Sequence, residues 1–345
     1  MDFVPPLVAV VVGAGVLALK VLLQSGRRAE DALADETWAS AARRVGGVVH
    51  ITPGSLFTSA SRTIEVTVEG VAIVADTLER RDWSKRGTME YTRVRTGFVP
   101  GMRAVSLRVW PRGPLSRVAR SLGLSHVPTG DPEFDAVFSV TGSPRSVSAA
   151  FLDEATRRFL VGAAEGFESD DHAIRVEREG LPRQTSTLVD MIGFIQKLVQ
   201  RWMTLGQGPA QVAEALGLEQ EGPLDLAITS GSVVARGIRR GSAVTLALRI
   251  GEQQIATIVT SEVNVAQDWA LERDDAGTLV DKGDRSGCPP AVLSVARGAP
   301  PALLALRQEG GTVELVLEGL SPDPEQVAGI LDGVIDAVAS GGGYR

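Results

Sequence analysis

Few residues in this sequence have the types and spacing that catalysis requires. The histidines His50, His126 and His172 lie far apart, and none stands at metal-ligand spacing from another histidine or from a cysteine. The single cysteine, Cys288, precedes a Pro-Pro pair in a glycine-rich turn and could be an exposed thiol. A thiol nucleophile also needs a base and an orienting group, and neither is recognisable nearby. Because the sequence also contains no Gly-x-Ser-x-Gly elbow and no Gly-x-x-x-x-Gly-Lys phosphate loop, it names no catalytic residue and predicts no cofactor.

Acidic clusters are the remaining candidates for metal chemistry. One lies at 131–135, a second at 170–171 beside His172, and a third in the loop Asp274–Asp284. A calcium loop needs oxygen ligands at fixed alternating positions around a glycine turn, and the sequence DDAGTLVDKGDRSG lacks that register. We therefore interpret these groups as solvated loop carboxylates and predict no metal site.

A basic cluster between two predicted strands is the candidate contact surface. Its cationic side chains surround a tryptophan, and its members are Arg80, Arg81, Trp83, Lys85 and Arg86. Beside a membrane anchor, such a cluster could contact anionic lipid, with each charge contributing about 1 kcal/mol near the surface. It could also contact a protein partner, and the plain alternative is a solvated loop.

The first apolar stretch of the chain predicts a membrane anchor, which would hold the basic cluster near a membrane. Val4–Leu23 is apolar apart from Lys20, and at about 1.5 Å per residue a helix of this length covers roughly the 30 Å hydrocarbon core. Arg27 and Arg28 follow it, whereas no basic residue precedes it. Because positive flanks stay on the cytoplasmic side, we expect a single transmembrane helix in a bacterial inner membrane, with the N-terminus outside and the body in the cytoplasm.

Two other interpretations of this stretch are weaker. A cleaved signal peptide usually begins with basic residues, and here the chain begins Met-Asp-Phe. The pattern Gly13-x-Gly15-x-x-Ala18 has the form of a dinucleotide-binding turn, but that turn needs a second buried strand ending in an acid. The following stretch is charged and helix-prone instead, so a membrane helix explains the glycines better.

Composition narrows the classes of partner. The chain has 345 residues, a net charge of −7 with both signs interspersed, and 5% aromatic residues. This pattern argues against nucleic acid as a partner, because a basic face and stacking platforms are both missing. A single cysteine excludes an internal disulfide framework and fits a reducing compartment.

Alternating and helical patterns predict an α+β body behind a stalk. Residues 24–44 are polar and alanine-rich, which favours a helical stalk or linker. In Arg62–Glu69, apolar residues alternate with polar ones, as in a half-buried strand, and Gly70 turns the chain into a second strand. We expect two similar subdomains, each an antiparallel sheet packed against helices. They cover 45–207 and 208–345, the second being shorter, with a boundary near Gly206–Pro209.

The two halves also resemble each other in sequence order, which suggests an internal duplication. Val313–Leu320 matches Ile174–Leu181, and Val292–Ala296 matches the predicted strand at Val137–Thr141. Beyond the Glu-Gly-Leu turns the register holds without a gap, so the apolar positions Leu188, Ile192, Ile195 and Val199 fall opposite Val327, Leu331, Val334 and Val338. The alternative is that any two strand–turn–helix units look alike, because amphipathic periodicity is generic.

One local stretch resembles a known group of proteins. The patterns GDxxFDxxFxV, from Gly130 to Val140, and LDxxxRxxL, from Leu152 to Leu160, resemble a stretch of uncharacterised bacterial membrane-anchored proteins. The resemblance covers about a tenth of the chain. It implies an N-terminal membrane segment before an α+β body, and it implies no activity. Members of that group more often have two membrane segments than one, so this chain departs from them in topology.

These observations favour a membrane-tethered interaction or scaffold module without a recognisable catalytic motif. One alternative is an enzyme, hydrolase-like, with its site between the two subdomains. Another is a structural protein that contacts lipid through the basic cluster. Each hypothesis makes the membrane a partner and leaves the protein partner unnamed.

Overall fold

The structure is a computed structural model in which the chain is described over most of its length. The described residues are 29–54, 59–82, 87–97, 105–112, 129–170, 173–220, 232–251, 253–263, 268–282, 287–320 and 322–341. The predicted membrane span at 4–23 lies outside these ranges. Within them, no helix is both long enough and apolar enough to cross a membrane.

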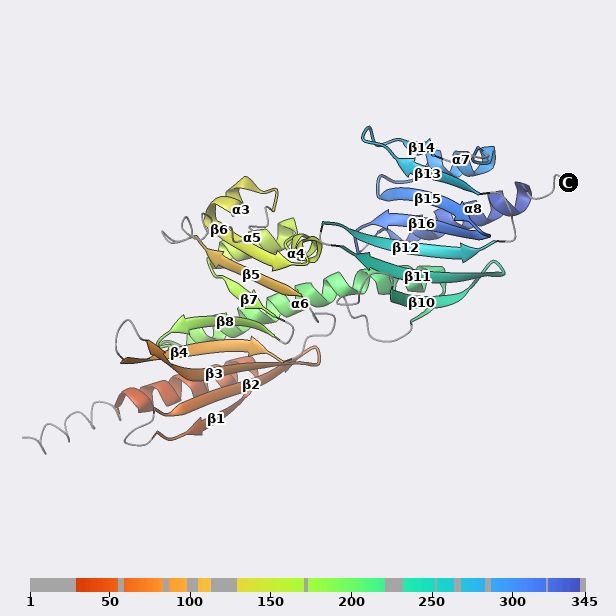
Figure 1. Ribbon diagram of the computed structural model, residues 1–345. Coiled ribbons are helices and arrows are strands. Elements are labelled where there is room, and N and C mark those ends of the chain that lie inside the picture. The colour runs from red at the N-terminus through yellow and green to blue at the C-terminus, as the bar shows by residue number, and fades with distance from the viewer. Residues whose placement is uncertain are drawn as a thin grey trace, which may run out of the picture. The chain divides into compact units, whose positions relative to one another are not determined.

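The fold is α+β and consists of two similar subdomains, each built on an eight-stranded antiparallel sheet (Figure 1). In the first sheet the strand order is β1-β2-β3-β4-β8-β7-β5-β6. Its strands are β1 (Val48–Thr52), β2 (Ser61–Val68), β3 (Val71–Asp82), β4 (Gly87–Thr96), β5 (Ser106–Pro111), β6 (Phe138–Ser143), β7 (Phe167–Ser169) and β8 (Ile174–Glu179).

The second sheet repeats this order. Written from its β9 edge, the order is β9-β10-β11-β12-β16-β15-β13-β14, so every strand occupies the place of its counterpart in the first sheet. Its strands are β9 (Glu219–Gln220), β10 (Ser232–Arg239), β11 (Ser242–Ile250), β12 (Ile255–Glu262), β13 (Trp269–Arg273), β14 (Leu279–Asp281), β15 (Leu303–Glu309) and β16 (Thr312–Glu318). The similarity expected from the sequence is therefore present in the topology.

The helices that precede the first strand and follow the last strand of each sheet occupy equivalent positions in the two subdomains. A helix over 29–45 precedes β1, and the long helix α6 (Thr185–Leu216) both follows β8 and precedes β9. The others are α3 (Pro132–Val137), α4 (Arg145–Phe151), α5 (Glu154–Ala163), α7 (Pro290–Arg297) and α8 (Pro324–Gly341). Two sequence expectations differ from this. α6 runs on through Gly206–Pro209, and Val292–Ala296, which was matched to a strand, lies in α7, so that match is wrong.

The two subdomains share backbone details as well as order. The β2–β3 turn holds Glu69 and Gly70 at φ values of 51° and 80°, and the β10–β11 turn holds Arg240 and Gly241 at 50° and 79°. Two successive residues at positive φ are what a tight two-residue hairpin turn requires, and glycine adopts this conformation without a steric penalty.

A second shared detail lies where each sheet passes into its following helix. The Thr92 hydroxyl donates to the Gly180 carbonyl at 2.9 Å, and the Thr257 hydroxyl donates to the Gly319 carbonyl at 2.8 Å. Both threonines are fully buried. The glycines that follow β8 and β16 both have a φ of 86°, so the same side-chain bond holds the same turn twice.

The chain divides into two compact units, Met1–Gly97 with Arg175–Gln196, and Phe98–Ile174 with Lys197–Arg345. In the first unit, alternate residues of β2, β3 and β4 form the core, including Ile64, Ile73 and Val94. The helix over 29–45, expected as a stalk, buries Trp38 completely and contributes to this core. The start of α6 adds Leu188, Ile192 and Ile195. On the other face of these strands, side chains such as Asp76 and Arg95 stay 14% and 44% exposed, respectively.

Arg62 fixes the helix over 29–45 to the sheet. Its side chain is fully buried, and its guanidinium bonds Asp35 at 2.7 Å and Asp31 at 2.9 Å from the helix. It also donates to the carbonyl oxygens of Asp31 and Ala60. A buried arginine is tolerated only where its donors find acceptors, so these bonds determine how the helix sits on β2.

In the second unit, the second sheet buries one row of side chains across the six strands between its two edge strands. The row is Leu271, Leu306, Leu315, Val259, Leu246 and Ala235, in the order that the strand register places them. The α8 residues that the sequence matched to α6, Val327, Leu331, Val334 and Val338, are buried as well. The predicted helix stripe is therefore a core stripe in both subdomains.

Candidate functional site

The basic cluster predicted from the sequence lies at the end of the β3–β4 hairpin, and the structure describes part of it. Trp83, Lys85 and Arg86 fall outside the described residues, whereas Arg80 and Arg81 end β3. Arg80 bonds both oxygens of Glu177 on β8, at 2.7 and 2.9 Å, and lies 5.5 Å above the ring of Tyr91 on β4. Arg80 thus belongs to the open face of the sheet rather than to an isolated tip.

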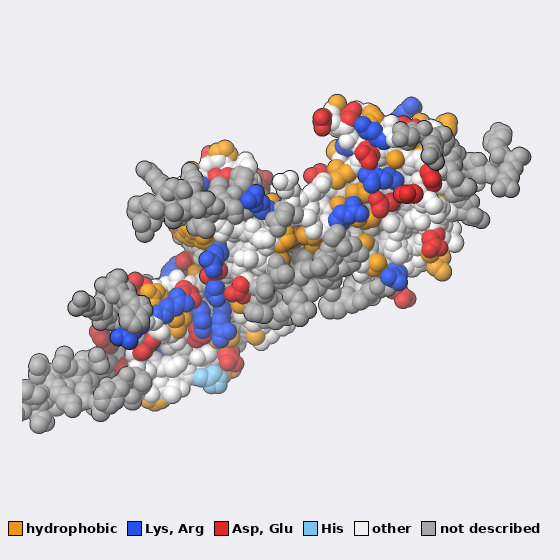
Figure 2. Space-filling model, viewed as in Figure 1, with side chains coloured by type: hydrophobic (Ala, Val, Ile, Leu, Met, Phe, Trp, Pro, Cys, Tyr) orange, Lys and Arg blue, Asp and Glu red, His pale blue; other side chains and the backbone are white. Residues whose placement is uncertain are grey.

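That open face carries a set of ionised side chains that we call the charged face. Its members are Asp76 and Arg80 on β3, Arg93 and Arg95 on β4, and Arg175 and Glu177 on β8. The alternation of the strands produces it, because residues directly opposite each other share a face while their neighbours in sequence point to the core. Lys and Arg side chains gather over these strands in the space-filling view (Figure 2).

One row of the charged face alternates in sign. Asp76 lies opposite Arg93, and Arg93 lies opposite Glu177. Arg93 binds the Asp76 carboxylate with two bonds of 2.9 and 2.7 Å, and only 14% of the Asp76 side chain is exposed. The hydrogen bond to Asp76 raises the pKa of Arg93 above its ordinary value. Two-pronged bonds of this kind fix both side chains, so this row is rigid.

The next row breaks the alternation, because Arg95 lies directly opposite Arg175. Opposed residues of an antiparallel pair have Cβ atoms about 5 Å apart, and like charges there repel. Arg95 is 44% exposed and makes a 3.4 Å contact with the Asp76 carboxylate, whose nearer bonds go to Arg93. Two arginines thus lie opposite each other at this end of the charged face.

The second sheet has different chemistry at the equivalent positions. Aligning Thr92 with Thr257 and Gly180 with Gly319 places Ile258 where the first sheet has Arg93, and Val316 where it has Glu177. Ile258 and Val316 are opposite each other and are 5% and 8% exposed, respectively. The two subdomains thus share a topology, but this row is ionic in the first subdomain and apolar in the second.

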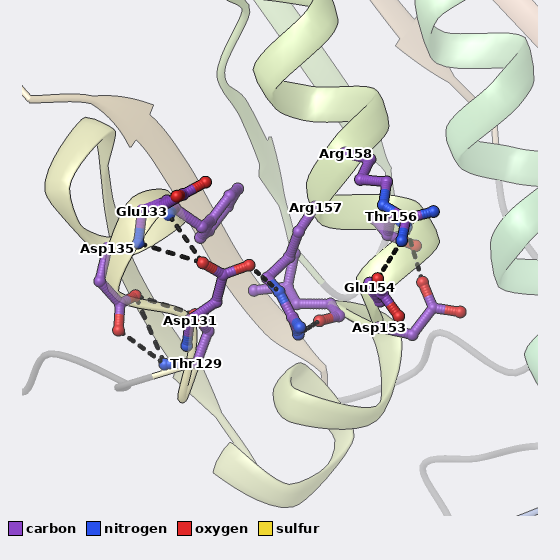
Figure 3. A network of polar contacts seen from close by, with 11 residues as sticks. Thr129, Asp131, Glu133, Asp135, Asp153, Glu154, Thr156, Arg157 and Arg158 are labelled. Atoms are coloured by element: carbon purple, nitrogen blue, oxygen red, sulfur yellow. Dashed lines mark hydrogen bonds and ion pairs between the residues drawn. The ribbon is translucent and has the colours of Figure 1, made fainter.

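The stretch from Gly130 to Leu160, which carries the sequence resemblance described above, forms a network of hydrogen bonds that cap helices (Figure 3). The Asp131 carboxylate accepts from the backbone N–H groups of Glu133 and Phe134, both at 3.1 Å, and caps α3. It also accepts from Arg157 of α5 at 3.1 Å. The backbone bond from Phe134 and the bond from Arg157 lower the pKa of Asp131. Its bonds are those of a structural cap.

The other members of this network have the same role. Asp135 accepts from the Thr129 backbone and hydroxyl, and Asp153 caps α5 through a 2.6 Å bond from the Thr156 N–H. Figure 3 shows these carboxylates turned toward the helix starts. Asp131 and Asp135 of the acidic cluster are therefore cap and turn groups.

A shallow hollow in the first unit brings two glutamates together. Glu79 on β3 lies opposite Glu90 on β4, and they line a space of about 230 Å³ with Ser59, Ser61, Thr77 and other residues. Glu79 accepts from the Ser59 N–H at 3.3 Å. The hollow is acidic and opens from the strand positions opposite to those of the charged face.

The remaining sequence candidates do not assemble into a reactive centre in the described part of the chain. No group of three or more His, Cys, Asp or Glu residues there is arranged to hold a metal ion. Cys288 is buried rather than exposed, and its N–H donates to Asp281 at 2.9 Å. Burial, and then the charge of Asp281, raise the pKa of its thiol to about 12. His50 lies on β1, while His126 and His172 are outside the described residues.

Sequence reasoning missed most of the charged face. It identified Arg80 and Arg81 as part of a local cluster, whereas Asp76, Arg93 and Glu177 come from three different strands. A signal was present, because β4 reads Arg-Val-Arg and β8 reads Arg-Val-Glu, each with charges flanking a core valine. Only the strand order shows that these triplets are neighbours.

No protein-family model matches the sequence, and no curated protein or solved structure shows significant similarity to it.

Proposed function

We propose that the protein is a membrane-tethered interaction module whose charged face docks a partner. The observation that carries this proposal is the ionic row of the first sheet, in which Arg93 and Glu177 stand at positions where the second sheet has the buried apolar residues Ile258 and Val316. Ion pairs on an open sheet face add little stability, so their presence there is better explained by recognition. The apolar segment Val4–Leu23 anchors the chain in a bacterial inner membrane, with the body in the cytoplasm.

The packing of the helix over 29–45 supports the tether. The described part of this helix begins at residue 29, next in sequence to Arg27 and Arg28, the predicted cytoplasmic flank, and the buried Arg62 binds Asp31 and Asp35 near that end. A folded body attached this way stays close to the bilayer. The charged face lies on the opposite side of β2 from this helix, because Arg62 and Ile64 point to the core. It is thus open to a partner.

Site-specific photo-crosslinking in native membranes tests this proposal. A benzoylphenylalanine at Glu65, an exposed position on the same face as Arg95, should cross-link a reproducible protein band. The same group at Glu36, which is exposed on the helix over 29–45, serves as the matched control. Equal cross-linking from both positions, or none from Glu65, would contradict a docking role for the charged face.

Lipid contact is the second candidate, favoured by one observation. β3 and β4 extend past the start of β2, and the helix over 29–45 begins at that same end of the sheet, where Asp31 and Asp35 bind Arg62 (Figure 1). Arg80 and Arg81, which lie near the end of β3, are therefore at the end of the sheet from which the tether leads. Removing the charges of Arg80, Arg81, Lys85 and Arg86 should reduce binding to phosphatidylglycerol vesicles, and unchanged binding would exclude this role.

A further inference from the structure

We infer that β1 is a dimerisation strand, through which two copies of the chain pair edge to edge and antiparallel at the surface of one membrane. The proposed function concerns a face of the first sheet, whereas this inference concerns its edge and the partner that the edge accepts. Confinement of both copies to one bilayer rests on the anchor of the proposed function. The pairing itself rests on the strand.

β1 is an edge strand without the usual protection. It stands first in the strand order, and in the described part of the chain β2 is the strand that pairs with it (Figure 1). Edge strands present unpaired backbone N–H and C=O groups, and soluble proteins usually protect them with charged side chains, proline or a bulge. The sequence of β1 is VVHIT, its register with β2 is continuous, and Val48 is 60% exposed. The strand therefore keeps the features that favour the addition of another strand.

The equivalent edge of the second sheet is protected. β9 occupies the place of β1, but it has only two residues, Glu219 and Gln220, and both are polar and exposed. At the other edge of that sheet, β14 has three residues and ends in Asp281. Because the same topology forms with a short and polar strand at this place, the length and apolar character of β1 are explained by pairing rather than by folding.

The side chains of β1 are suited to pairing with a second copy of the same strand. An antiparallel pair centred on His50 places Val49 opposite Ile51 of the second copy. Both side chains are half-buried on the core side of the sheet, where Val49 lies opposite Ile64 of β2. Pairing extends this apolar row across the two-fold axis and removes more of it from water. Like charges do not oppose each other, because β1 has no Lys, Arg, Asp or Glu.

The symmetry of this pairing agrees with a common bilayer. Two antiparallel edge strands of identical chains are related by a two-fold axis normal to the sheet, so corresponding residues lie on the same face. The helix over 29–45 packs on the core face through Trp38, so the helices of both copies lie on one side of the paired sheets. The anchors that precede these helices can then enter one bilayer. The two charged faces lie together on the other side.

The small size of the strand makes the membrane part of the interaction. A pair of five-residue strands buries much less than the roughly 1,200 Å² at the lower end of specific, stable interfaces. Anchoring both copies in one bilayer raises their effective concentration and offsets the small area. We therefore expect dimers in the membrane and monomers in dilute detergent.

Disulfide cross-linking in native membranes tests the pairing and its register. In the His50→Cys variant the two thiols face each other at the two-fold axis, where the Cα atoms of an antiparallel pair are about 4.5–5.5 Å apart, within the span of a disulfide. Oxidation with copper phenanthroline should give a covalent dimer. Thr63→Cys, opposite His50 on β2, is the matched control and should stay monomeric, because three strand spacings, about 14 Å, separate it from its counterpart. Cys288 is buried, so the wild type should give no dimer.

A pair of charge variants distinguishes specific pairing from random collision. Val48 and Thr52 are exposed and lie opposite each other across the proposed two-fold axis. In the His50→Cys background, V48K/T52K places lysine opposite lysine twice and should lower the dimer fraction at least fivefold. V48K/T52E changes the same positions but places lysine opposite glutamate, so it should keep the dimer fraction of its parent. Thermal denaturation should give the two variants equal melting temperatures.

The outcomes for the edge and for the anchor are separate. Absence of a His50→Cys dimer in membranes, an equal yield from Thr63→Cys, or equal yields from the two charge variants would each overturn the inference. Extraction of the protein by alkaline carbonate would instead contradict the anchor of the proposed function. Cross-linking of the concentrated, purified chain then decides the pairing: a dimer from His50→Cys alone supports it, and no dimer overturns it.

Discussion

Arg62 is the residue that joins the helix over 29–45 to the sheet, and it differs from the ionised groups on the charged face. It is fully buried, whereas its partners Asp31 and Asp35 keep 48% and 38% of their side chains exposed. In β10, a bulge between Val233 and Ala235 shifts the register, so the position equivalent to Arg62 is Ser232. This contact belongs to the first subdomain, the one that follows the predicted anchor.

Replacement of Arg62 by methionine should destabilise the first unit by about 2 to 3 kcal/mol. This is less than the 3–5 kcal/mol typical of a broken buried pair, because the two acids left behind can be hydrated. Urea denaturation measures the loss, and limited proteolysis after residue 45 should become faster. Arg44→Met, an exposed arginine on the same helix, is the control and should change neither quantity. An unaltered urea midpoint for Arg62→Met would contradict the structural role.

Cys288 should be unreactive in the folded protein. Its thiol pKa of about 12, against an ordinary 9.0, leaves about a thousandfold less thiolate at neutral pH. Alkylation by iodoacetamide should be slow in the native state and fast in guanidinium chloride. Asp281→Asn removes the negative charge and should accelerate alkylation. Because the folded pKa is raised, the stability from this group is full below pH 9 and is lost as the pH rises toward 12. Fast alkylation of the native protein at pH 7 would refute this.

At the scale of elements, the turn that follows β8 and β16 should be equally important in both subdomains. Thr92→Val and Thr257→Val each remove a buried hydroxyl and leave a glycine carbonyl without its side-chain donor. We expect a loss of about 1 to 2 kcal/mol for each. Chemical denaturation checks this, with Thr63→Val on the open face of β2 as a control that should have little effect. A clear loss of stability for only one of the two variants would show that the shared hydrogen bond does not stabilise both subdomains equally.

The contact between the end of β10 and α8 should be sensitive to acid. Asp332 binds Arg239 at 2.6 and 2.8 Å and Arg240 at 3.1 Å, and the Arg239 bonds in particular lower its pKa below the ordinary 3.8. A lowered folded pKa means that this stability is present above pH 3.8 and is lost as the pH falls below it. Asp332→Asn should therefore lower stability at pH 7 and reduce its decline below pH 4. An identical acid profile for variant and wild type would count against the assignment.

Some elements could be predicted from local pattern and others could not. The alternation in Arg62–Glu69 predicted β2, because one face of that strand is buried and the other is wet. α6 crosses the Gly206–Pro209 stretch against local propensity, and buried positions beyond it, Val212 and Leu216, indicate that packing outweighs that cost. Val292–Ala296 is helical because a proline pair precedes it and Pro290 opens α7.

At the scale of the whole molecule, the sequence predicted the architecture better than the site. The matched stripes of α6 and α8 suggested two similar subdomains, and the shared strand order of the two sheets confirms the similarity. The charged face was largely missed, because its residues come from three strands and a single sequence carries no information on strand order. The clustering of basic residues along the sequence indicated the tip of the β3–β4 hairpin instead. One residue of that cluster, Arg80, forms an ion pair with Glu177 in the charged face.

The rigid row beside the arginine pair has a consequence for the energetics of binding. A long charged side chain that becomes fixed in an interface loses rotamer freedom, which opposes association by about 0.5–1.5 kcal/mol. Arg80 and Arg93 have already lost that freedom to Glu177 and Asp76. A partner that docks beside them meets a preorganised surface. These arginines lose their rotamer entropy when the protein folds, so the entropic penalty on binding is smaller.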